Sequence, residues 1–368
     1  MVGASTPADA IRAVVVDDTV LYRMLVTEGV DRVPGFRVVG QAADGAAALR
    51  LIDELQPQLL LLDLEMPVLD GMQVLETLRR RRRQIHTLLI SAQSTEGARI
   101  TLEALQLGAF DFITKPAAGG LEQSRRALFG EIAERLETLR GRLRPGTGAP
   151  PRGRRSTPAP PPAETAAGGI REALRAVAAR RVDAVGIGIS TGGPQALPQL
   201  LPALGSGCPP VLVVQHMPAP FLTALARKLD ALAAVEVVEA ADGMPLGPGR
   251  VYVAPGGVQL GVRRRGLRGE AVLREDPPEN HCRPAADYLF RALAAAYGGS
   301  ALGMVMTGMG GDGAAGLLAM RRSGALTLAQ DEASSTVYGM PRRALELGAA
   351  DCVLSLDQLR QVLGALGR

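Results

Sequence analysis

Apolar and polar positions in the first part of the chain follow two alternating patterns. Short runs of consecutive apolar residues, typical of strands in a parallel sheet, are separated by segments with the three-to-four-residue apolar spacing of amphipathic helices. The last helical segment extends to about Leu143. The pattern predicts one α/β domain, a parallel sheet with helices on both faces. Its expected strands are Ile11–Val16, Phe36–Gly40, Leu59–Leu62, Thr87–Ile90 and Phe110–Ile113.

The segment from Pro145 to Ala167 has no apolar periodicity. It is rich in Pro, Gly, Ala and Arg and contains Pro150-Pro151 and Pro158-Ala159-Pro160-Pro161-Pro162. This composition is typical of an extended linker. A short helix, Ile170–Arg180, is expected after it.

Strand and helix patterns resume beyond this linker and predict a second α/β domain, doubly wound and mostly parallel. Pro284–Tyr297 reads as a helix. Val258–Val262 and Ala271–Arg274 flank a basic turn, Arg263 to Gly269, and predict an appended β-hairpin. The expected parallel strands are Ala184–Ile189, Val211–Gln215, Val251–Val253, Leu302–Thr307 and Leu326–Ala329.

Composition narrows the class of protein. The 368 residues are 47% hydrophobic, but no uninterrupted apolar stretch is long enough to span a bilayer. Met1 to Ala10 lacks the basic start and apolar core of a secretory signal, so we expect a cytoplasmic protein without membrane insertion. Cys208, Cys282 and Cys352 form no Cys-x-x-Cys pair, which favours reduced, structural thiols.

The net charge of +4 and the pI near 9.2 raise the question of nucleic-acid binding. The arginines cluster at Arg79 to Arg83 and from Arg140 to Arg155. Neither cluster has interleaved aromatic residues on which bases could stack. We therefore interpret both as solvated charge and expect no nucleic-acid partner. We also expect a monomer.

Acidic and phosphate-binding side chains follow the strands of the first domain. Because the carboxyl ends of parallel strands meet at one edge of a sheet, these side chains are expected to form one pocket. Carboxylates brought together this way favour a hard divalent ion with oxygen ligands, typically Mg²⁺. The carboxylate after the third strand would be a nucleophile for phosphorus, and the hydroxyl and ammonium groups would bind phosphoryl oxygens. The residues are Asp17 and Asp18 after the first strand, Asp63 after the third, Ser91 after the fourth and Lys115 after the fifth.

On these five positions, residues 11 to about 125 resemble a two-component receiver domain, a flavodoxin-like (βα)5 fold. The resemblance implies that Asp63 is the phosphoacceptor and that Ser91 and Lys115 contact the phosphate. It implies that Phe112 takes the aromatic switch position. The metal ligands implied are Asp17, Asp18, Asp63 and the backbone carbonyl of Glu65.

A serine stands at the end of the first expected strand of the second domain. The apolar run Val185–Ile189 leads directly into Ser190-Thr191-Gly192-Gly193-Pro194, where glycines permit a sharp strand-to-helix turn and a close substrate approach. This is how an acyl-transfer nucleophile is presented. A dinucleotide site also begins with a glycine-rich turn, but in Gly186-x-Gly188-x-Ser190-Thr191-Gly192 the third glycine falls one position late.

A serine nucleophile needs a base, and the chain has only three histidines. His216 follows the strand Val211–Gln215 and is the preferred candidate. His281 lies in a polar loop and is the alternative, whereas His86 belongs to the first domain.

Asp312, in the glycine-rich loop Thr307-Gly308-Met309-Gly310-Gly311-Asp312-Gly313, would orient the imidazole. A purely structural alternative makes Asp312 a helix N-cap.

Residues 182 to 355 are similar to the catalytic domain of chemotaxis protein-glutamate methylesterases. The similarity rests on these motifs together with Gln215-His216-Met217-Pro218 and Tyr252-Val253-Ala254-Pro255-Gly256. The resemblance implies phosphorylation-activated hydrolysis of glutamate γ-methyl esters, with methanol release, and deamidation of glutamines on chemoreceptor helices. Ser190, His216 and Asp312 would be the triad, and the backbone N–H groups of Thr191 and Met309 the oxyanion donors. The expected partners are methyl-accepting chemotaxis receptors and a chemotaxis histidine kinase. Ester hydrolysis would need no cofactor.

The implied organisation is a receiver domain (11–125), a helical and Pro/Arg-rich linker (126–181) and a methylesterase domain (182–355). Two positions depart from the family pattern. Cys282 stands where the family usually has a histidine before Arg283-Pro284, and Gln259 replaces another histidine. The rival hypotheses are a response regulator with a DNA-binding output domain, for which no helix-turn-helix pattern is present, and a non-catalytic adaptor.

Overall fold

The computed structural model describes residues 10–115, 120–143, 166–266 and 268–367. Its contacts divide the chain into two compact units, Met1–Gly153 and Arg154–Arg368, which are described separately below. Residues 145–165 of the expected linker lie outside the described residues. Ala166 and Ala167, which we assigned to the linker, instead begin a helix of the second unit.

The first unit contains a five-stranded sheet in the order β2-β1-β3-β4-β5, with every neighbouring pair parallel. This is the predicted (βα)5 fold, and the observed strand ends agree with the expected ones within two residues. Leu59 to Leu62 of the central strand are fully buried, as a strand covered on both faces requires. The strands are β1 (Ile11–Val16), β2 (Phe36–Ala42), β3 (Leu59–Asp63), β4 (His86–Ser91) and β5 (Asp111–Thr114).

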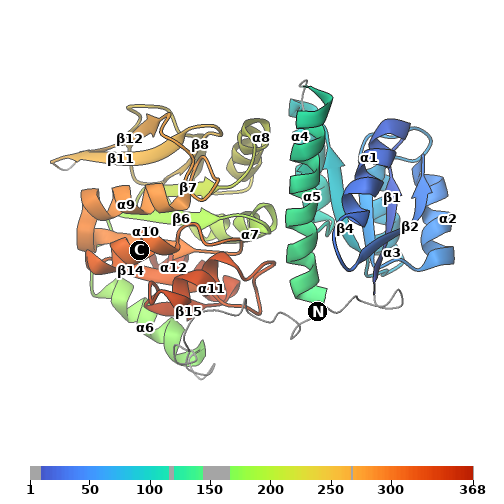
Figure 1. Ribbon diagram of the computed structural model, residues 1–368. Helices are drawn as coiled ribbons and strands as arrows, with labels where there is room; N and C mark the ends of the chain where they lie inside the picture. The colour runs from blue at the N-terminus through green and yellow to red at the C-terminus, as the bar shows by residue number, and fades with distance from the viewer. Residues whose placement is uncertain (1–9, 116–119, 144–165, 267, 368) are drawn as a thin grey trace, which may run out of the picture. The chain divides into compact units, whose positions relative to one another are not determined.

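A helix follows each of these strands (Figure 1). Three of the helices begin at a polar residue whose side chain accepts a hydrogen bond from a backbone N–H of the first turn: Asp44, Asp70 and Ser94. The last helix packs against the first and extends well past residue 125, to Leu143. The helices are α1 (Val20–Asp31), α2 (Gly45–Leu55), α3 (Gly71–Arg80), α4 (Thr95–Gln106) and α5 (Leu121–Leu143).

The second unit is built on a seven-stranded parallel sheet in the order β15-β14-β13-β6-β7-β10-β8. The two strands that lead to Ser190 and His216 have the predicted bounds, residue for residue. The strands are β6 (Ala184–Ile189), β7 (Val211–Gln215), β8 (Glu236–Glu239), β10 (Arg250–Val253), β13 (Ala301–Val305), β14 (Leu326–Gln330) and β15 (Cys352–Leu354).

The predicted hairpin is confirmed as antiparallel β11 (Gln259–Arg265) and β12 (Arg268–Arg274), which β9 (Pro245–Leu246) extends to three strands. The strands continue into the segment that we assigned to a basic turn, Arg263 to Gly269. Arg263 pairs with Glu270 across the ladder, so these arginines belong to strands and not to a loop.

Seven α-helices are described in the second unit (Figure 1). The expected helix from Pro284 begins two residues later, at Ala286. Two short 3₁₀ segments, Leu201–Ala203 and Gly298–Ser300, are also present. No helix in the described part of the chain is long and apolar enough to cross a membrane. The α-helices are α6 (Ala166–Ala178), α7 (Gly193–Leu200), α8 (Ala219–Asp230), α9 (Ala286–Tyr297), α10 (Ala314–Arg322), α11 (Met340–Glu346) and α12 (Leu356–Ala365).

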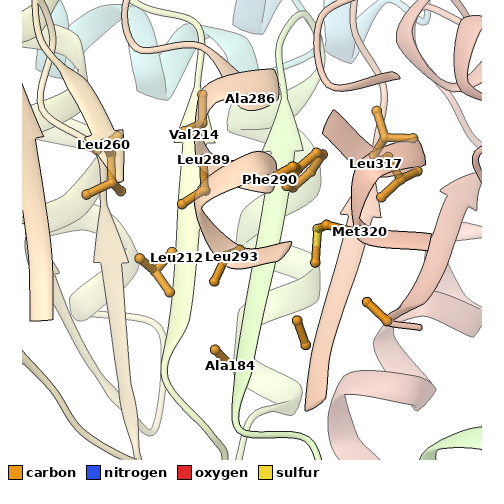
Figure 2. Close-up of a cluster of buried hydrophobic side chains, with 14 of the residues drawn as sticks. Ala184, Leu212, Val214, Leu260, Ala286, Leu289, Phe290, Leu293, Leu317 and Met320 are labelled. Carbon is orange, nitrogen blue, oxygen red and sulfur yellow. The ribbon is translucent and has the colours of Figure 1, made fainter. Parts of the chain in front are cut away.

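Helix α9 packs against β6, β11 and α10 and supplies Leu289, Phe290 and Leu293 to the core cluster in Figure 2. Strand β6 accommodates this helix through its glycines. A Cβ at Gly188 would lie 2.6 Å from the Ala286 Cβ, so only glycine allows the helix to start so close to the strand. The first turn of α9 is thereby held next to the end of β6, where Ser190 stands.

Candidate functional site

Three adjacent strands carry the three predicted triad residues at their carboxyl ends. Strand β6 lies between β13 and β7. Ser190 directly follows β6, His216 directly follows β7, and Asp312 lies in the loop between β13 and α10. The sheet therefore brings these three segments to one edge, as predicted from the parallel-strand rule.

Backbone hydrogen bonds fix the strand ends relative to one another. The Ser190 N–H donates to the Thr307 carbonyl (2.9 Å), and the His216 N–H donates to the Ile189 carbonyl (3.1 Å). The buried side chain of Gln215 donates from Nε2 to the Ser190 carbonyl at 3.0 Å. The backbone on both sides of Ser190 is thus held by the loops that carry its predicted partners.

His216 Nε2 and Asp312 Oδ2 form a hydrogen bond of 2.7 Å. Both side chains are largely withdrawn from solvent, with exposed fractions of 12% and 2%. Burial lowers the pKa of His216, but the hydrogen bond to Asp312 and the neighbouring Cys282 outweigh it and raise the pKa to about 9. The site therefore stabilises an imidazolium.

Three further groups donate hydrogen bonds to the Asp312 carboxylate. Its carboxylate accepts from the backbone N–H groups of Ala286 (2.6 Å) and Asp287 (3.1 Å) and from Asn280 Nδ2 (3.1 Å). Burial raises the pKa of Asp312, but the bonds to His216 and to these N–H groups outweigh it, and the net shift is downward. The carboxylate is therefore held ionised.

Asp312 does not cap α10, the helix that follows it in the chain. That helix has Gly313 at its N-cap, and no side-chain bond caps it. The Asp312 carboxylate instead accepts from the first turn of α9, a helix about 25 residues earlier in the chain. The aspartate thus binds a helix N-terminus and the imidazole together.

Ser190 lies at a turn that depends on glycine. Gly192 has φ +88°, and a Cβ there would lie 2.5 Å from Thr336. A Cβ at Gly308 would lie 2.7 Å from the Ser190 Cβ, so glycine allows the loop after β13 to approach the serine. Ser190 is partly exposed. No hydrogen bond of its hydroxyl with His216 is present among the described residues, so this link of the triad stays a prediction.

The expected oxyanion donors belong to two segments: Thr191 directly follows Ser190, and Met309 lies in the loop after β13. Thr191 is buried, and its carbonyl accepts a hydrogen bond from Thr307 Oγ1 (2.8 Å). Met309 follows Gly308 in the neighbouring loop and is half-buried. The roles of their N–H groups stay predictions.

The alternative base, His281, is exposed, and Asp312 contacts His216 instead. His281 (φ +64°) and Asn280 (φ +49°) form a two-residue turn that the backbone of Glu279 and Cys282 closes with two hydrogen bonds. Sequence reasoning missed Asn280, because no periodicity or motif marks its contact with Asp312.

Gln259, the second departure from the family pattern, is buried. Its side chain accepts a hydrogen bond from the Ala285 N–H at 2.8 Å, so it supports the start of α9.

In the first unit, the predicted acidic pocket forms at the carboxyl ends of β1, β3 and β5. Lys115 Nζ lies 2.7 Å from Asp63 Oδ2 and 2.9 Å from Asp17 Oδ2. Burial raises the pKa of Asp63 to about 6 and exceeds the lowering effect of Lys115, while the Asp17 charge raises it further. The side chains of Asp17 and Asp63 are buried, whereas Asp18 is exposed.

The donor set of this pocket fits a hard divalent ion. One carboxylate oxygen from each of Asp17, Asp18 and Asp63 lies within 4.8 Å of the others. Asp17 Oδ2 is buried and, apart from its ionic contact with Lys115, has no hydrogen-bond partner. An all-oxygen set with such an oxygen suits Mg²⁺. Glu65, whose carbonyl the resemblance makes a ligand, donates its N–H to Asp63 Oδ1 (3.3 Å).

Ser91 and Phe112, the other two residues to which the resemblance gives a switch role, are both buried. The Ser91 hydroxyl accepts a hydrogen bond from Thr101 Oγ1 of α4 at 2.7 Å. In this state the Ser91 hydroxyl is bonded to α4, so a contact with a phosphoryl group would require an exchange of partners.

Two protein-family models match separate parts of the chain. Residues 13–123 match the family described as response regulator receiver domain, and residues 185–363 match the family described as CheB methylesterase. A solved structure, the crystal structure of the Thermotoga maritima CheB methylesterase catalytic domain, shows 35% identity. It covers 50% of this chain and 98% of that chain, with a TM-score of 0.49.

Curated relatives match nearly the whole chain. The protein-glutamate methylesterase/protein-glutamine glutaminase of Desulfotalea psychrophila is 40% identical over 356 residues, which is 95% of this chain and 97% of the relative. The protein of the same name from Bordetella parapertussis is 43% identical over 359 residues, 97% of each chain. The chain therefore belongs to the family of protein-glutamate methylesterases/protein-glutamine glutaminases that carry a response regulator receiver domain.

Proposed function

We propose that the chain hydrolyses glutamate γ-methyl esters and deamidates glutamines on the cytoplasmic helices of methyl-accepting chemotaxis receptors, with Ser190, His216 and Asp312 as its triad. The observation that best supports this is the 2.7 Å bond between His216 and Asp312 at the sheet edge where Ser190 stands. An imidazole with a buried carboxylate on one nitrogen is the arrangement that activates a serine hydroxyl.

The bond between His216 and Asp312 supports different roles for the two ring nitrogens. Nε2 is bonded to Asp312, so Nδ1 is the nitrogen that accepts the Ser190 proton. The Ser190 Oγ attacks the ester carbonyl, and the N–H groups of Thr191 and Met309 stabilise the oxyanion. His216 then returns the proton to the departing methanol. Water attacks the acyl-enzyme in the same way and releases a glutamate carboxylate. With a glutamine substrate the leaving group is ammonia.

Asp312 matters most when His216 becomes charged. The carboxylate raises the pKa of His216, so it stabilises the imidazolium formed when the serine proton is taken. Its contacts with the first turn of α9 hold the carboxylate in place during this step. Electrostatic stabilisation and orientation are thereby provided by the same side chain.

We propose that the first unit regulates this activity through a phosphoryl group on Asp63. With a pKa near 6, Asp63 is mostly ionised at neutral pH and can attack the phosphohistidine of a chemotaxis histidine kinase. Asp17, Asp18, Asp63 and the Glu65 carbonyl would hold Mg²⁺, which neutralises charge on the phosphoryl oxygens. Lys115 already contacts the Asp63 oxygen and would pair with the phosphoryl group.

Phosphorylation would increase ester hydrolysis through the buried switch residues. A phosphoryl oxygen that takes the Ser91 hydroxyl would break its bond with Thr101 of α4. Phe112, on the neighbouring strand, would repack with it. The proposed location is the cytoplasm, because the receptor helices and the kinase are present there. The proposed oligomeric state is a monomer.

The test is methanol release from methylated receptor membranes. The Ser190→Ala protein should release no methanol above background but should still accept phosphate from a small phosphodonor such as acetyl phosphate. Methanol release by Ser190→Ala at the unaltered rate would refute the proposed triad. An Asp63→Asn protein should show no stimulation by the phosphodonor, whereas stimulation equal to that of the unaltered protein would refute the regulatory site.

A further inference from the structure

Beside the triad lies a group of side chains with three different ligand atoms. The Cys282 sulfur, a His216 ring nitrogen and an Asp312 carboxylate oxygen all lie within 4.8 Å of one another. Cys282 is one of the two positions at which this chain departs from the pattern that the resemblance implies. Ester hydrolysis as proposed above makes no use of this thiol.

The thiol is held at the site by the turn that carries it. Two backbone hydrogen bonds between Glu279 and Cys282 close the turn. Asn280 anchors the turn to the site, because its Nδ2 donates to Asp312 Oδ1. Cys282 and His216 are both partly exposed, so a small ion in solution can reach them. The other two cysteines, Cys208 and Cys352, are buried.

The ligand types select the kind of ion. Sulfur, imidazole nitrogen and carboxylate oxygen form a donor set suited to Zn²⁺ and related borderline or soft ions, whereas Mg²⁺ prefers oxygen alone. The acidic pocket of the first unit, with its carboxylates, has the opposite preference. The chain therefore contains two donor sets that prefer different metal ions.

We propose that His216, Cys282 and Asp312 form an inhibitory binding site for Zn²⁺ or another thiophilic divalent metal ion. The ion takes the place of the proton between His216 Nε2 and Asp312 Oδ2, and the 2.7 Å separation of these atoms lengthens to admit it. Binding releases this proton and the thiol proton of Cys282, so the affinity falls as the pH falls.

Inhibition follows from the state of the imidazole, and this part rests on the proposed function. A neutral imidazole with the metal on Nε2 carries its one proton on Nδ1. Nδ1 then has no lone pair for the Ser190 proton, and the hydroxyl is not activated. Metal binding itself does not depend on the ester being the substrate.

Cobalt tests the site without any measurement of activity. Co²⁺ titrated into the full chain should give a near-ultraviolet thiolate-to-metal absorption band with one ion per chain, and Zn²⁺ but not Mg²⁺ should abolish it. The Cys282→Ser protein should lack the band, although it retains Cys208 and Cys352. His281→Asn, in the same turn, is the matched control, because Asn tolerates the left-handed backbone there. It should keep the band.

Cys282→His provides a second variant that restores a ligand. It should bind Zn²⁺ in competition with a chromophoric chelator but give no thiolate band with Co²⁺. No band in the unaltered protein, or an undiminished band in Cys282→Ser, would overturn the proposal. The Ser190→Ala protein should show the normal band even if the proposed triad proves wrong, so the two failures can be told apart.

Methanol release then tests inhibition. Each variant is compared with its own untreated rate, with Zn²⁺ buffered and later removed by a chelator. The Zn²⁺ concentration for half-inhibition should rise at least about tenfold in Cys282→Ser, since loss of a ligand costs no less than loss of an outer-shell partner. Equal sensitivity of the two proteins, or stimulation by Zn²⁺, would contradict the inhibitory site.

Discussion

Asn280 donates a 3.1 Å hydrogen bond to Asp312 Oδ1, the carboxylate oxygen that His216 does not contact. The same amide nitrogen lies 3.0 Å from Asp287 Oδ2. Asp287 is buried, and burial together with the Asp312 charge raises its pKa. One amide thus bridges two buried carboxylates that would otherwise repel each other.

Asn280→Ala should therefore impair catalysis without changing any triad residue. Loss of a hydrogen bond to a charged group costs about 1.5–3 kcal/mol, which corresponds to a decrease of roughly 10–100-fold if the full effect reaches the transition state. We expect kcat to fall while KM changes little, because the Asn280 amide donates to Asp312 and Asp287 and would act through the position of the Asp312 carboxylate. His281→Asn is the control. An unaltered kcat in Asn280→Ala would show that the bridge does not position Asp312.

The pH dependence of catalysis should reflect the raised pKa of His216. The general base is the neutral imidazole, so kcat/KM should rise with pH and level off above about pH 9. Asp312→Asn removes the carboxylate that raises the pKa of His216, so the acidic limb should move to lower pH while the maximum rate falls. Measurement of kcat/KM between pH 5 and 10 checks both, and an acidic limb that Asp312→Asn does not move would contradict the assignment.

Removal of Mg²⁺ should affect the regulatory function of the first unit but not ester hydrolysis by the second. Chelation of Mg²⁺ should abolish the stimulation of methanol release by acetyl phosphate, because the acidic pocket needs a cation for phosphoryl transfer. The unstimulated rate should not fall, because the proposed ester hydrolysis uses no metal. Readdition of Mg²⁺ should restore stimulation. Persistence of full stimulation in the chelator would exclude the proposed metal dependence.

Replacement of Gly188 even by alanine should lower the free energy of unfolding. In Gly188→Ala the new methyl would lie 2.6 Å from the Ala286 Cβ, and α9 would have to shift. Overpacking of this kind costs about 1–3 kcal/mol of folding free energy. The shift would also disturb the Ala286 N–H that binds Asp312. Urea denaturation followed by circular dichroism measures the loss. Gly205→Ala, where a Cβ meets nothing within 4 Å, is the control and should unfold at the unaltered midpoint.

The fold class and most strands could be predicted from sequence because buried parallel strands have continuous apolar runs. Strands β6 and β7 are such runs, and they place Ser190 and His216 at strand ends. Strands β8, β9 and β15 are not among the expected strands. Strand β8 is two valines between glutamates, and β15 is only three residues long, so neither differs from a loop in its pattern.

The supporting contacts of the site could not be predicted in the same way. Asn280, Asp287 and the start of α9 reach Asp312 across 25 to 32 residues, through a turn whose left-handed backbone no motif announces. Nothing in the local pattern around Gly188 indicates that it makes room for α9, as the structure shows. Long-range packing, and not local pattern, determines these features.

The link between Ser190 and His216 can be tested most directly by labelling with a fluorophosphonate, which reacts with an activated serine hydroxyl. We predict that mass spectrometry finds the label on Ser190 and that labelling and loss of methanol release proceed together. We also predict that His216→Gln slows labelling by at least about a hundredfold, as loss of a general base should. Labelling of a different residue, or of Ser190 at an equal rate in His216→Gln, would contradict the proposed triad.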